Sequence, residues 1–250
     1  MKKHGIRTLI TACSLAFLSL GGLNACVEPG IMGSGVPRTE SRDLSAFSSV
    51  AVYNGFEFVF IENNQRAIPT VRLTIDDNLS PFVDMTVNNG QLIVRLNQLV
   101  SSATRRIEVE GPPLAGLRLF GRSKGNVSRW VSRFPVRIEV DANSNLEIGA
   151  LEADSAQFQV TGQSTLNITG GAVSSVVLTA NNRSSIRAEA MRTQRVDATL
   201  TDRSLARVNV LTLLNATLSS TSELSYSGNP QIRPNLLDRD SRLTPLDVGG

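Results

Sequence analysis

The repeated serines are the first candidates for catalytic residues in this chain, because a serine hydroxyl becomes a nucleophile when a general base lies beside it. The usual base is histidine, but the one histidine of the chain, His4, falls in the N-terminal leader. A Ser–His pair, an imidazole zinc site and a histidine proton shuttle are therefore not expected in the processed protein. The repeated serines, separated by 18 to 21 residues, are Ser123, Ser144, Ser164, Ser184, Ser204 and Ser222.

The residues around each serine alternate, and this alternation predicts two short strands joined by a corner. Apolar residues stand six and four positions before Ser164, at Phe158 and Val160, and two and four positions after it, at Leu166 and Ile168. A period of two puts alternate side chains on one side of a strand. Because a unit of about 20 residues cannot bury a core alone, such units must stack. The sequence therefore predicts an all-β fold, a parallel β-helix or β-solenoid with about 20-residue coils, in which the serines are structural corner residues.

The start of the chain has the features of an export signal. Three basic residues within positions 2–7 precede an apolar run from Leu9 to Leu20, and the run Leu23 to Cys26 ends it with small residues before the cysteine. This pattern resembles a bacterial lipobox, in which the leader is cleaved before the cysteine and the cysteine is lipidated. We predict a lipoprotein-type signal peptide at residues 1–25, lipidation of Cys26, and attachment to the membrane of the cell envelope. Val27 favours the outer membrane by analogy; the alternative is an ordinary secretory leader cut nearby.

Removal of the leader changes the charge of the chain. The leader carries three of the 25 basic residues, which leaves 22 basic residues beside 22 acidic ones. A nucleic-acid partner needs a concentrated basic patch, and the arginines are scattered along the sequence, so no nucleic-acid partner is expected. Cys13 leaves with the leader, so no disulfide is expected either. No motif predicts a cofactor.

The chain on the N-terminal side of the repeats divides into two parts. Residues 26–40 are rich in glycine and proline and predict a flexible tether. Alternation begins after residue 40, and Asn89-Gly90 between two apolar runs predicts a hairpin. We expect one domain over residues 41–232, whose hairpin-rich N-terminal portion leads into the repeats at about 114–228.

The C-terminal residues 233–250 lack the apolar alternation of the repeats. Pro234 and Pro245 interrupt them, and charges alternate between the two prolines. We therefore do not expect another coil here. The tail is predicted to cover the terminal edge of the solenoid or to be disordered.

Several segments together resemble a known family. They are Gly33 to Gly35, Arg42 to Val52, Asp77 to Leu79, Asn89 to Val94, Pro113-Leu114 before the serine repeats, and Tyr226 to Pro230 after them. Over residues 33–232 the chain resembles the head GIN domain family, whose members are named as putative auto-transporter adhesins. The resemblance implies a β-solenoid in a secreted or lipid-anchored bacterial protein, and it carries no established activity or site. The asparagines on either side of Ser144 depart from the family pattern, which often has glycine there.

The expected function is that of a non-catalytic cell-envelope lipoprotein, an adhesin or surface-binding scaffold whose ligand is an extracellular or envelope glycan or protein. The first alternative is a polysaccharide-acting enzyme on a parallel β-helix. Glycoside hydrolysis needs two carboxylates about 5 to 9.5 Å apart, and the acids of this chain fall at different positions of the repeat. These acids are Asp141, Glu147, Asp197, Asp202 and Glu223.

The second alternative is an ordered outward surface that binds a glycan or ice. Threonine also suits an exposed strand for reasons of β-propensity alone. The candidate columns stand five residues before the serine at Thr179, Thr199 and Thr217, and three residues before it at Thr161, Asn181 and Thr201.

The lone tryptophan, Trp130, lies between the first two repeats. It could stack on a sugar or cover the end of the core, since its indole ring suits both roles. We favour the second role, a lid over the core.

Overall fold

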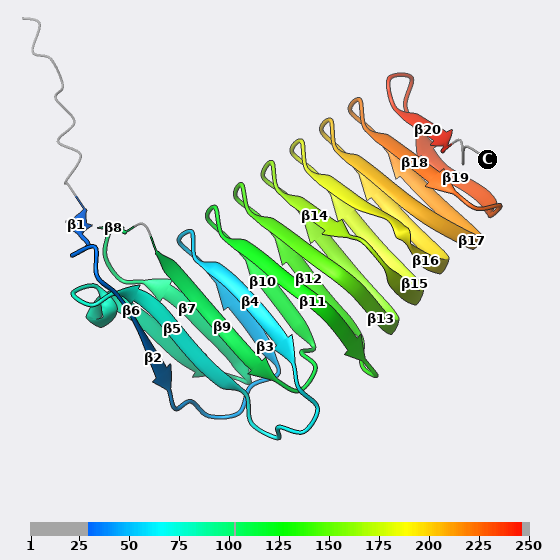
Figure 1. Ribbon diagram of the computed structural model, residues 1–250. Helices are drawn as coiled ribbons and strands as arrows, with labels where there is room; N and C mark the ends of the chain where they lie inside the picture. The colour runs from blue at the N-terminus through cyan, green and yellow to red at the C-terminus, as the bar shows by residue number, and fades with distance from the viewer. Residues whose placement is uncertain (1–29, 103, 247–250) are drawn as a thin grey trace, which may run out of the picture.

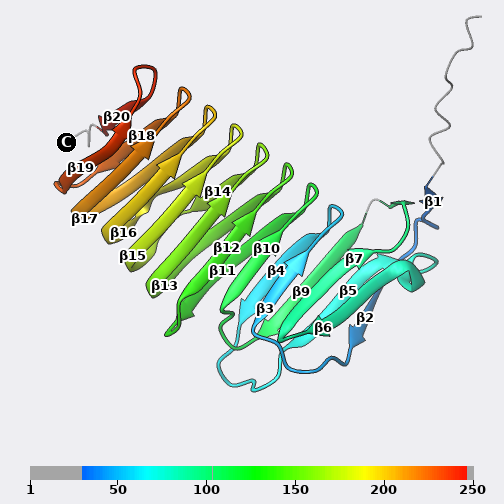
Figure 2. The same cartoon turned by 180° about the vertical axis from the view of Figure 1, so that it is seen from behind.

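The computed structural model describes residues 30–102 and 104–246 and is all-β (Figures 1 and 2). The predicted signal peptide, His4, Cys13 and Cys26 lie outside the described residues. β1 (Ile31–Met32) pairs with β8 (Val100–Ser101), and the other strands form one continuous winding sheet. The other elements are β2 (Pro37–Arg42), β3 (Ser49–Val52), β4 (Glu57–Glu62), β5 (Thr70–Asp76), the 3-10 helix η1 (Ser80–Phe82), β6 (Val83–Asn88), β7 (Gln91–Leu96), β9 (Arg105–Gly111), β10 (Gly116–Leu119), β11 (Lys124–Ser132), β12 (Val136–Val140), β13 (Asn145–Val160), β14 (Thr165–Ile168), β15 (Gly171–Ala180), β16 (Ser185–Leu200), β17 (Leu205–Leu218), β18 (Glu223–Ser227), β19 (Gln231–Leu237) and β20 (Arg242–Pro245).

The repeats stack in parallel as the coils of a β-solenoid, which confirms the predicted fold class. Leu166 lies beside Leu146 on one side and Ile186 on the other, each 20 residues away. Each coil runs along one sheet, turns a corner and returns along a second sheet, and the corners line up along one edge (Figure 1). The strands that lead into the serine corners form one sheet, which we call the pre-corner sheet, and the strands that follow the corners form the post-corner sheet. The pre-corner sheet contains β7, β3, β10, β12, β15, β19 and the C-terminal halves of β13, β16 and β17. The post-corner sheet contains β9, β4, β11, β14, β18, β20 and the N-terminal halves of β13, β16 and β17.

The core lies between the two sheets and is built from the inward columns that the alternation predicted. Phe158 and Val160 before Ser164, and Leu166 and Ile168 after it, are all buried. Their register partners in the neighbouring coils are apolar as well. Each coil therefore completes its core only with the coils on both sides of it, which is why the fold must form as a stack.

The serine corners rest on a pair of residues with positive φ. Before Ser144 these are Ala142 (φ 55°) and Asn143 (φ 63°), the backbone of a tight turn. Ser144 is buried, its Oγ accepts a hydrogen bond from the Ser123 amide at 3.2 Å, and its own amide donates to Ser164 Oγ at 3.1 Å. The Ser123 hydroxyl donates to the carbonyl three residues before it at 2.7 Å. A serine at this place thus satisfies backbone groups within its own turn and between coils.

The solenoid begins before the first serine repeat. β3 and β4 stack directly on β10 and β11, and β7 and β9 stack on the other side of β3 and β4. By register Phe56 takes the place of the serine in this coil, after Asn54 and Gly55 with positive φ. The part expected to be only hairpin-rich therefore supplies coils of the solenoid, and the hairpin β6–β7 around Asn89-Gly90 leads into one of them.

The described part of the predicted flexible tether, residues 30–40, contains paired strands. β2 pairs antiparallel with β5, and β1 pairs with β8. The Ser34 hydroxyl donates to the Asp77 carboxylate at 2.6 Å, and the Ser34 amide donates to the Asn78 side chain at 2.9 Å. β2 is an edge strand with mostly exposed side chains, so its sequence has no apolar alternation to mark it.

The described part of the C-terminal tail, up to residue 246, also differs from the prediction, because it belongs to another coil. β19 stacks on β17 and β20 stacks on β18. Ser241 continues the serine column, since its Oγ accepts a hydrogen bond from the Ser222 amide at 3.1 Å. Pro234 and Pro245 are tolerated because this is the last coil among the described residues, and an edge strand does not need every amide for pairing.

Candidate functional site

The serine hydroxyls are held inside the corners and are not displayed as nucleophiles. All six serines of the predicted ladder are buried. Several of their hydroxyls bond to backbone groups, as at Ser123 and Ser222, each 2.7 Å from a carbonyl oxygen. Within residues 30–102 and 104–246 no three His, Cys, Asp or Glu side chains gather as metal ligands would. The candidate site must therefore be sought on the outward sides of the sheets.

The threonines five residues before the serines form a row on the outward side of the pre-corner sheet. Thr179 pairs with Thr199, and Thr199 pairs with Thr217, in adjacent parallel strands. Thr199 is exposed and the other two are half-buried, while the residues next to them in sequence are buried. Adjacent strands lie about 4.7–4.9 Å apart, so the three hydroxyls are presented at regular intervals. We call these three residues the threonine row.

The column three residues before the serines is also aligned, but its polar groups are partly used inside the protein. The Thr161 hydroxyl donates to the Asp141 carboxylate, and the Thr201 hydroxyl donates to the Asp202 carboxylate at 3.0 Å. The Asn181 side-chain oxygen is buried without a hydrogen-bond partner among the described residues. All three residues are half-buried. Of the two predicted columns, the threonine row is the more accessible to a ligand.

A charged group borders the threonine row. Arg195 forms an ion pair with Asp197 at 3.0 Å, and the Asn215 amide donates to the same carboxylate. Burial raises the pKa of Asp197, but the hydrogen bonds from Arg195 and Asn215 outweigh it and hold the pKa below its ordinary value. Asp197 therefore stays ionised beside the threonines.

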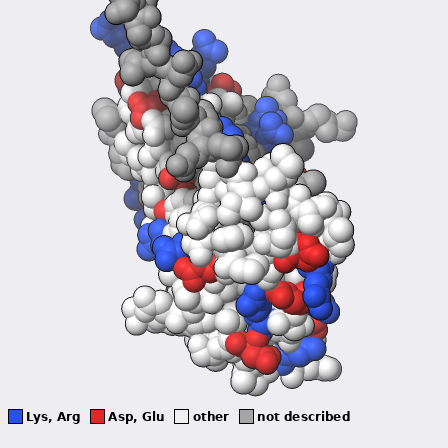
Figure 3. Space-filling view, turned by 90° about the vertical axis from the view of Figure 1, so that its left-hand side faces the viewer, with Lys and Arg blue, Asp and Glu red and all other residues white. Residues whose placement is uncertain are grey.

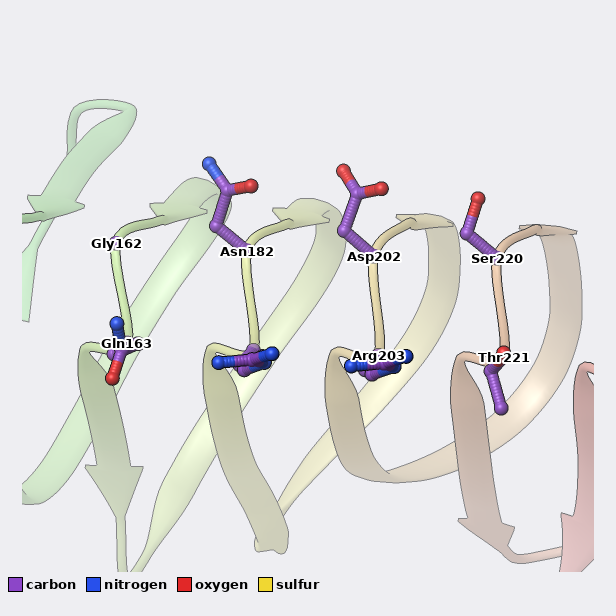
Figure 4. Close-up of a pocket in the computed structure, with 8 residues that line it drawn as sticks. Gly162, Gln163, Asn182, Asp202, Arg203, Ser220 and Thr221 are labelled. Carbon is purple, nitrogen blue, oxygen red and sulfur yellow. The ribbon is translucent and has the colours of Figure 1, made fainter.

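A groove of about 630 Å³ follows the corners and was missed from the sequence. It is lined by the two residues that precede the serine in successive coils. In Figure 4 Asn182, Asp202 and Ser220 extend in one direction, while Gln163, Arg203 and Thr221 extend in another. These residues form the turns of the corners. Their 20-residue spacing was the available signal, because residues that share a repeat position share a surface.

Trp130 lies in the core and does not present its ring to solvent. Its side chain is fully buried, its Nε1 donates to the Leu114 carbonyl at 2.8 Å, and its ring centre lies 6.2 Å from that of Phe60. The indole thus covers the core between the first serine coil and the coils before it, and a sugar cannot stack on it.

The described residues contain no helix long and apolar enough to cross a membrane. The predicted lipidation site, Cys26, precedes the first described residue by four positions. The described chain starts at the end of the solenoid opposite its C-terminal coil (Figure 1).

Comparisons with known proteins agree on the fold. Residues 46–230 match the family described as "Putative auto-transporter adhesin, head GIN domain". A putative adhesin from Bacteroides fragilis has a similar structure, with a TM-score of 0.76 and 16% identity over 86% of this chain and 96% of the other. A putative adhesin from Parabacteroides merdae gives 0.69 and 15% over 87% and 99%, and a putative lipid binding protein from Parabacteroides distasonis gives 0.66 and 16% over 87% and 99%. No curated protein matches the sequence.

Proposed function

This chain belongs to the head GIN domain family of putative auto-transporter adhesins, and from that premise we propose that it is a non-catalytic binding protein of the bacterial cell envelope. The observation that carries the proposal is the register of the threonine row. Three coils display the same hydroxyl at the same place, with buried residues behind it. A rigid row of this kind suits a repetitive or extended ligand.

A glycan or protein surface is the ligand class that we propose for the threonine row. Hydroxyl groups both donate and accept hydrogen bonds, which matches sugar hydroxyls and backbone amides alike. The ion pair of Arg195 and Asp197 interrupts the uncharged surface beside the row, which favours a glycan or protein over ice. The burial of all six serines favours binding over catalysis.

The threonine row can be tested by replacing hydroxyls with methyl groups. We expect Thr179→Val with Thr199→Val to weaken binding on a glycan array or to an immobilised envelope protein roughly tenfold, because two hydrogen bonds are lost at about 0.5–1.5 kcal/mol each. The matched control is Thr39→Val with Thr86→Val, which removes two exposed hydroxyls at the N-terminal end of the solenoid. Equal binding by both double variants would count against the threonine row as the binding surface.

We further propose that Cys26 carries lipid and holds the protein at the outer membrane. The solenoid would then extend away from the membrane, since the described chain begins at one end of the stack. Cys26→Ser is expected to abolish labelling by an alkyne fatty acid and to shift the protein from the detergent phase to the aqueous phase. Cys13→Ser, the matched control within the leader, should keep both properties. Persistent labelling of Cys26→Ser would rule out lipidation at this residue.

A further inference from the structure

Four arginines that are scattered in the sequence stack in two adjacent coils. Arg187 and Arg207 are register partners on β16 and β17. Arg183 and Arg203 occupy equivalent places in successive corners, and the Arg183 amide donates to the Asp202 carbonyl at 2.9 Å. All four side chains are exposed. We call these four residues the arginine array.

The corner residue before a serine shares a surface with the outward residues after it. This relation is visible three coils before the array, where Arg122, Lys124 and Asn126 line one hollow. They stand one residue before, one residue after and three residues after Ser123. Arg183 and Arg187 have the same relation to Ser184, and Arg203 and Arg207 have it to Ser204. The four guanidinium groups therefore belong to one outward surface of the post-corner sheet near the corners.

Stacked like charges are unusual in this protein. Two other strand arginines face a carboxylate on the neighbouring strand: Arg118 faces Glu139, and Arg72 faces Glu108. At the N-terminal end basic and acidic side chains lie intermixed (Figure 3). In the array arginine faces arginine, and like charges directly opposite each other destabilise a sheet.

The array is not neutralised by nearby acids. The carboxylates closest to it in the repeat are those of Asp202, Glu189 and Glu223. Among residues 30–102 and 104–246, none of them forms an ion pair with the four arginines. Asp202 instead accepts a hydrogen bond from Thr201 at 3.0 Å, and Figure 4 shows it extending in a different direction from Arg203.

We propose that the arginine array binds an acidic polysaccharide whose carboxylate or sulfate groups lie between arginines of adjacent coils. Guanidinium groups bind planar or tetrahedral oxyanions through paired hydrogen bonds. Two stacked pairs about 4.7–4.9 Å apart suit a polymer that repeats its anionic group better than a single ion. The neighbouring coil displays uncharged Gln163, Thr165 and Asn167, which can bond to sugar hydroxyls. This inference deepens the proposed function, on which it rests, by naming acidic glycans as the ligand class.

The test measures binding of the full-length protein, expressed with its leader, to immobilised polygalacturonate and dextran sulfate, with neutral dextran beside them. We expect Arg187→Gln with Arg207→Gln to weaken binding to both acidic polymers about tenfold or more, and the remaining binding to depend less on salt. The matched control is Arg38→Gln with Arg133→Gln, which removes the same charge at two exposed positions far from the array. The control should bind within about twofold of the unsubstituted protein. Thermal melting checks the fold, and the array variant should melt no lower than the unsubstituted protein, because a like-charge pair is removed.

Three outcomes would overturn the proposal. Equal weakening in the array and control variants would mean that only overall charge matters. Binding to neutral dextran as tight as binding to the acidic polymers would rule out acidic polysaccharides as the ligand class. Binding to vesicles containing anionic lipid, without binding to either acidic polymer, would identify a membrane surface as the occupant. The threonine double variant separates the two proposals, because it should keep its binding to the acidic polymers even where the threonine row fails its own test.

Discussion

Leu166→Asp is expected to abolish cooperative folding of the solenoid. The Leu166 side chain is fully buried between Leu146 and Ile186, its partners in the two adjacent coils. An aspartate there would be desolvated without a cationic partner, at a cost of several kcal/mol. Domains are stabilised by only about 5–15 kcal/mol in total, and each coil depends on its neighbours. Circular dichroism should therefore show no cooperative thermal transition in this variant.

The matched control is Asn167→Asp, which introduces the same charge one residue further along the same strand. Asn167 is on the outward side, with Glu147 and Arg187 as its register partners. The new carboxylate therefore meets one like and one opposite charge, and the free energy of unfolding should change by no more than about 0.5 kcal/mol. Ser164→Ala gives an intermediate reference. It is expected to lower the free energy of unfolding by about 1–3 kcal/mol, because it leaves the Ser144 amide without its acceptor. A Leu166→Asp variant that melts like the unsubstituted protein would contradict the register of the coils.

The repeats could be predicted because their inward positions are selected by packing. A residue such as Leu166 must be apolar in every coil, since the residues above and below it are its environment. The serine recurs because its hydroxyl can satisfy backbone groups at the corner, as Ser144 accepts from the Ser123 amide and Ser222 donates to the Ser219 carbonyl. Both requirements make the same residue types recur about every 20 residues, and this recurrence is visible in a single sequence.

The two ends of the solenoid were predicted less well, because their coils satisfy the same geometry with other residues. Phe56 takes the serine position in the β3–β4 coil and fills it with a ring. In the last coil Ser241 keeps the serine position, but Pro234 and Pro245 interrupt the sequence pattern by which strands are recognised. The last coil has one neighbour fewer among the described residues, so proline is tolerated there.

The surface could be predicted only in part. The threonine row was recognised because one residue type repeats in one column. The arginine array could not be recognised in the same way, because Arg183 and Arg203 stand at corners whose other members in this position are Gln163 and Thr221. Only the register of β16 and β17 shows that Arg187 and Arg207 lie side by side. Charge that is evenly spread in a sequence can thus be concentrated by a 20-residue repeat.

Trp130→Ala is expected to lower the free energy of unfolding by about 3–5 kcal/mol, the usual cost of removing a large buried aromatic side chain. The indole is fully buried, has Leu151 as its register partner, and packs near Phe60. Its loss would open a cavity where the first serine coil meets the coils before it. Urea denaturation followed by circular dichroism measures this change.

Trp130→Phe separates packing from hydrogen bonding at the same position. Phenylalanine keeps most of the buried ring but removes the Nε1 donor, which leaves the Leu114 carbonyl without its 2.8 Å partner. The expected cost is about 1–3 kcal/mol, which places this variant between the unsubstituted protein and Trp130→Ala. If Trp130 were instead a sugar-stacking residue, both variants would keep their stability and lose glycan binding. Since the chain has one tryptophan, its fluorescence gives an independent check: a buried indole should not change its emission when a saturating glycan is added, because the ligand would lie on the outward surfaces and not in the core.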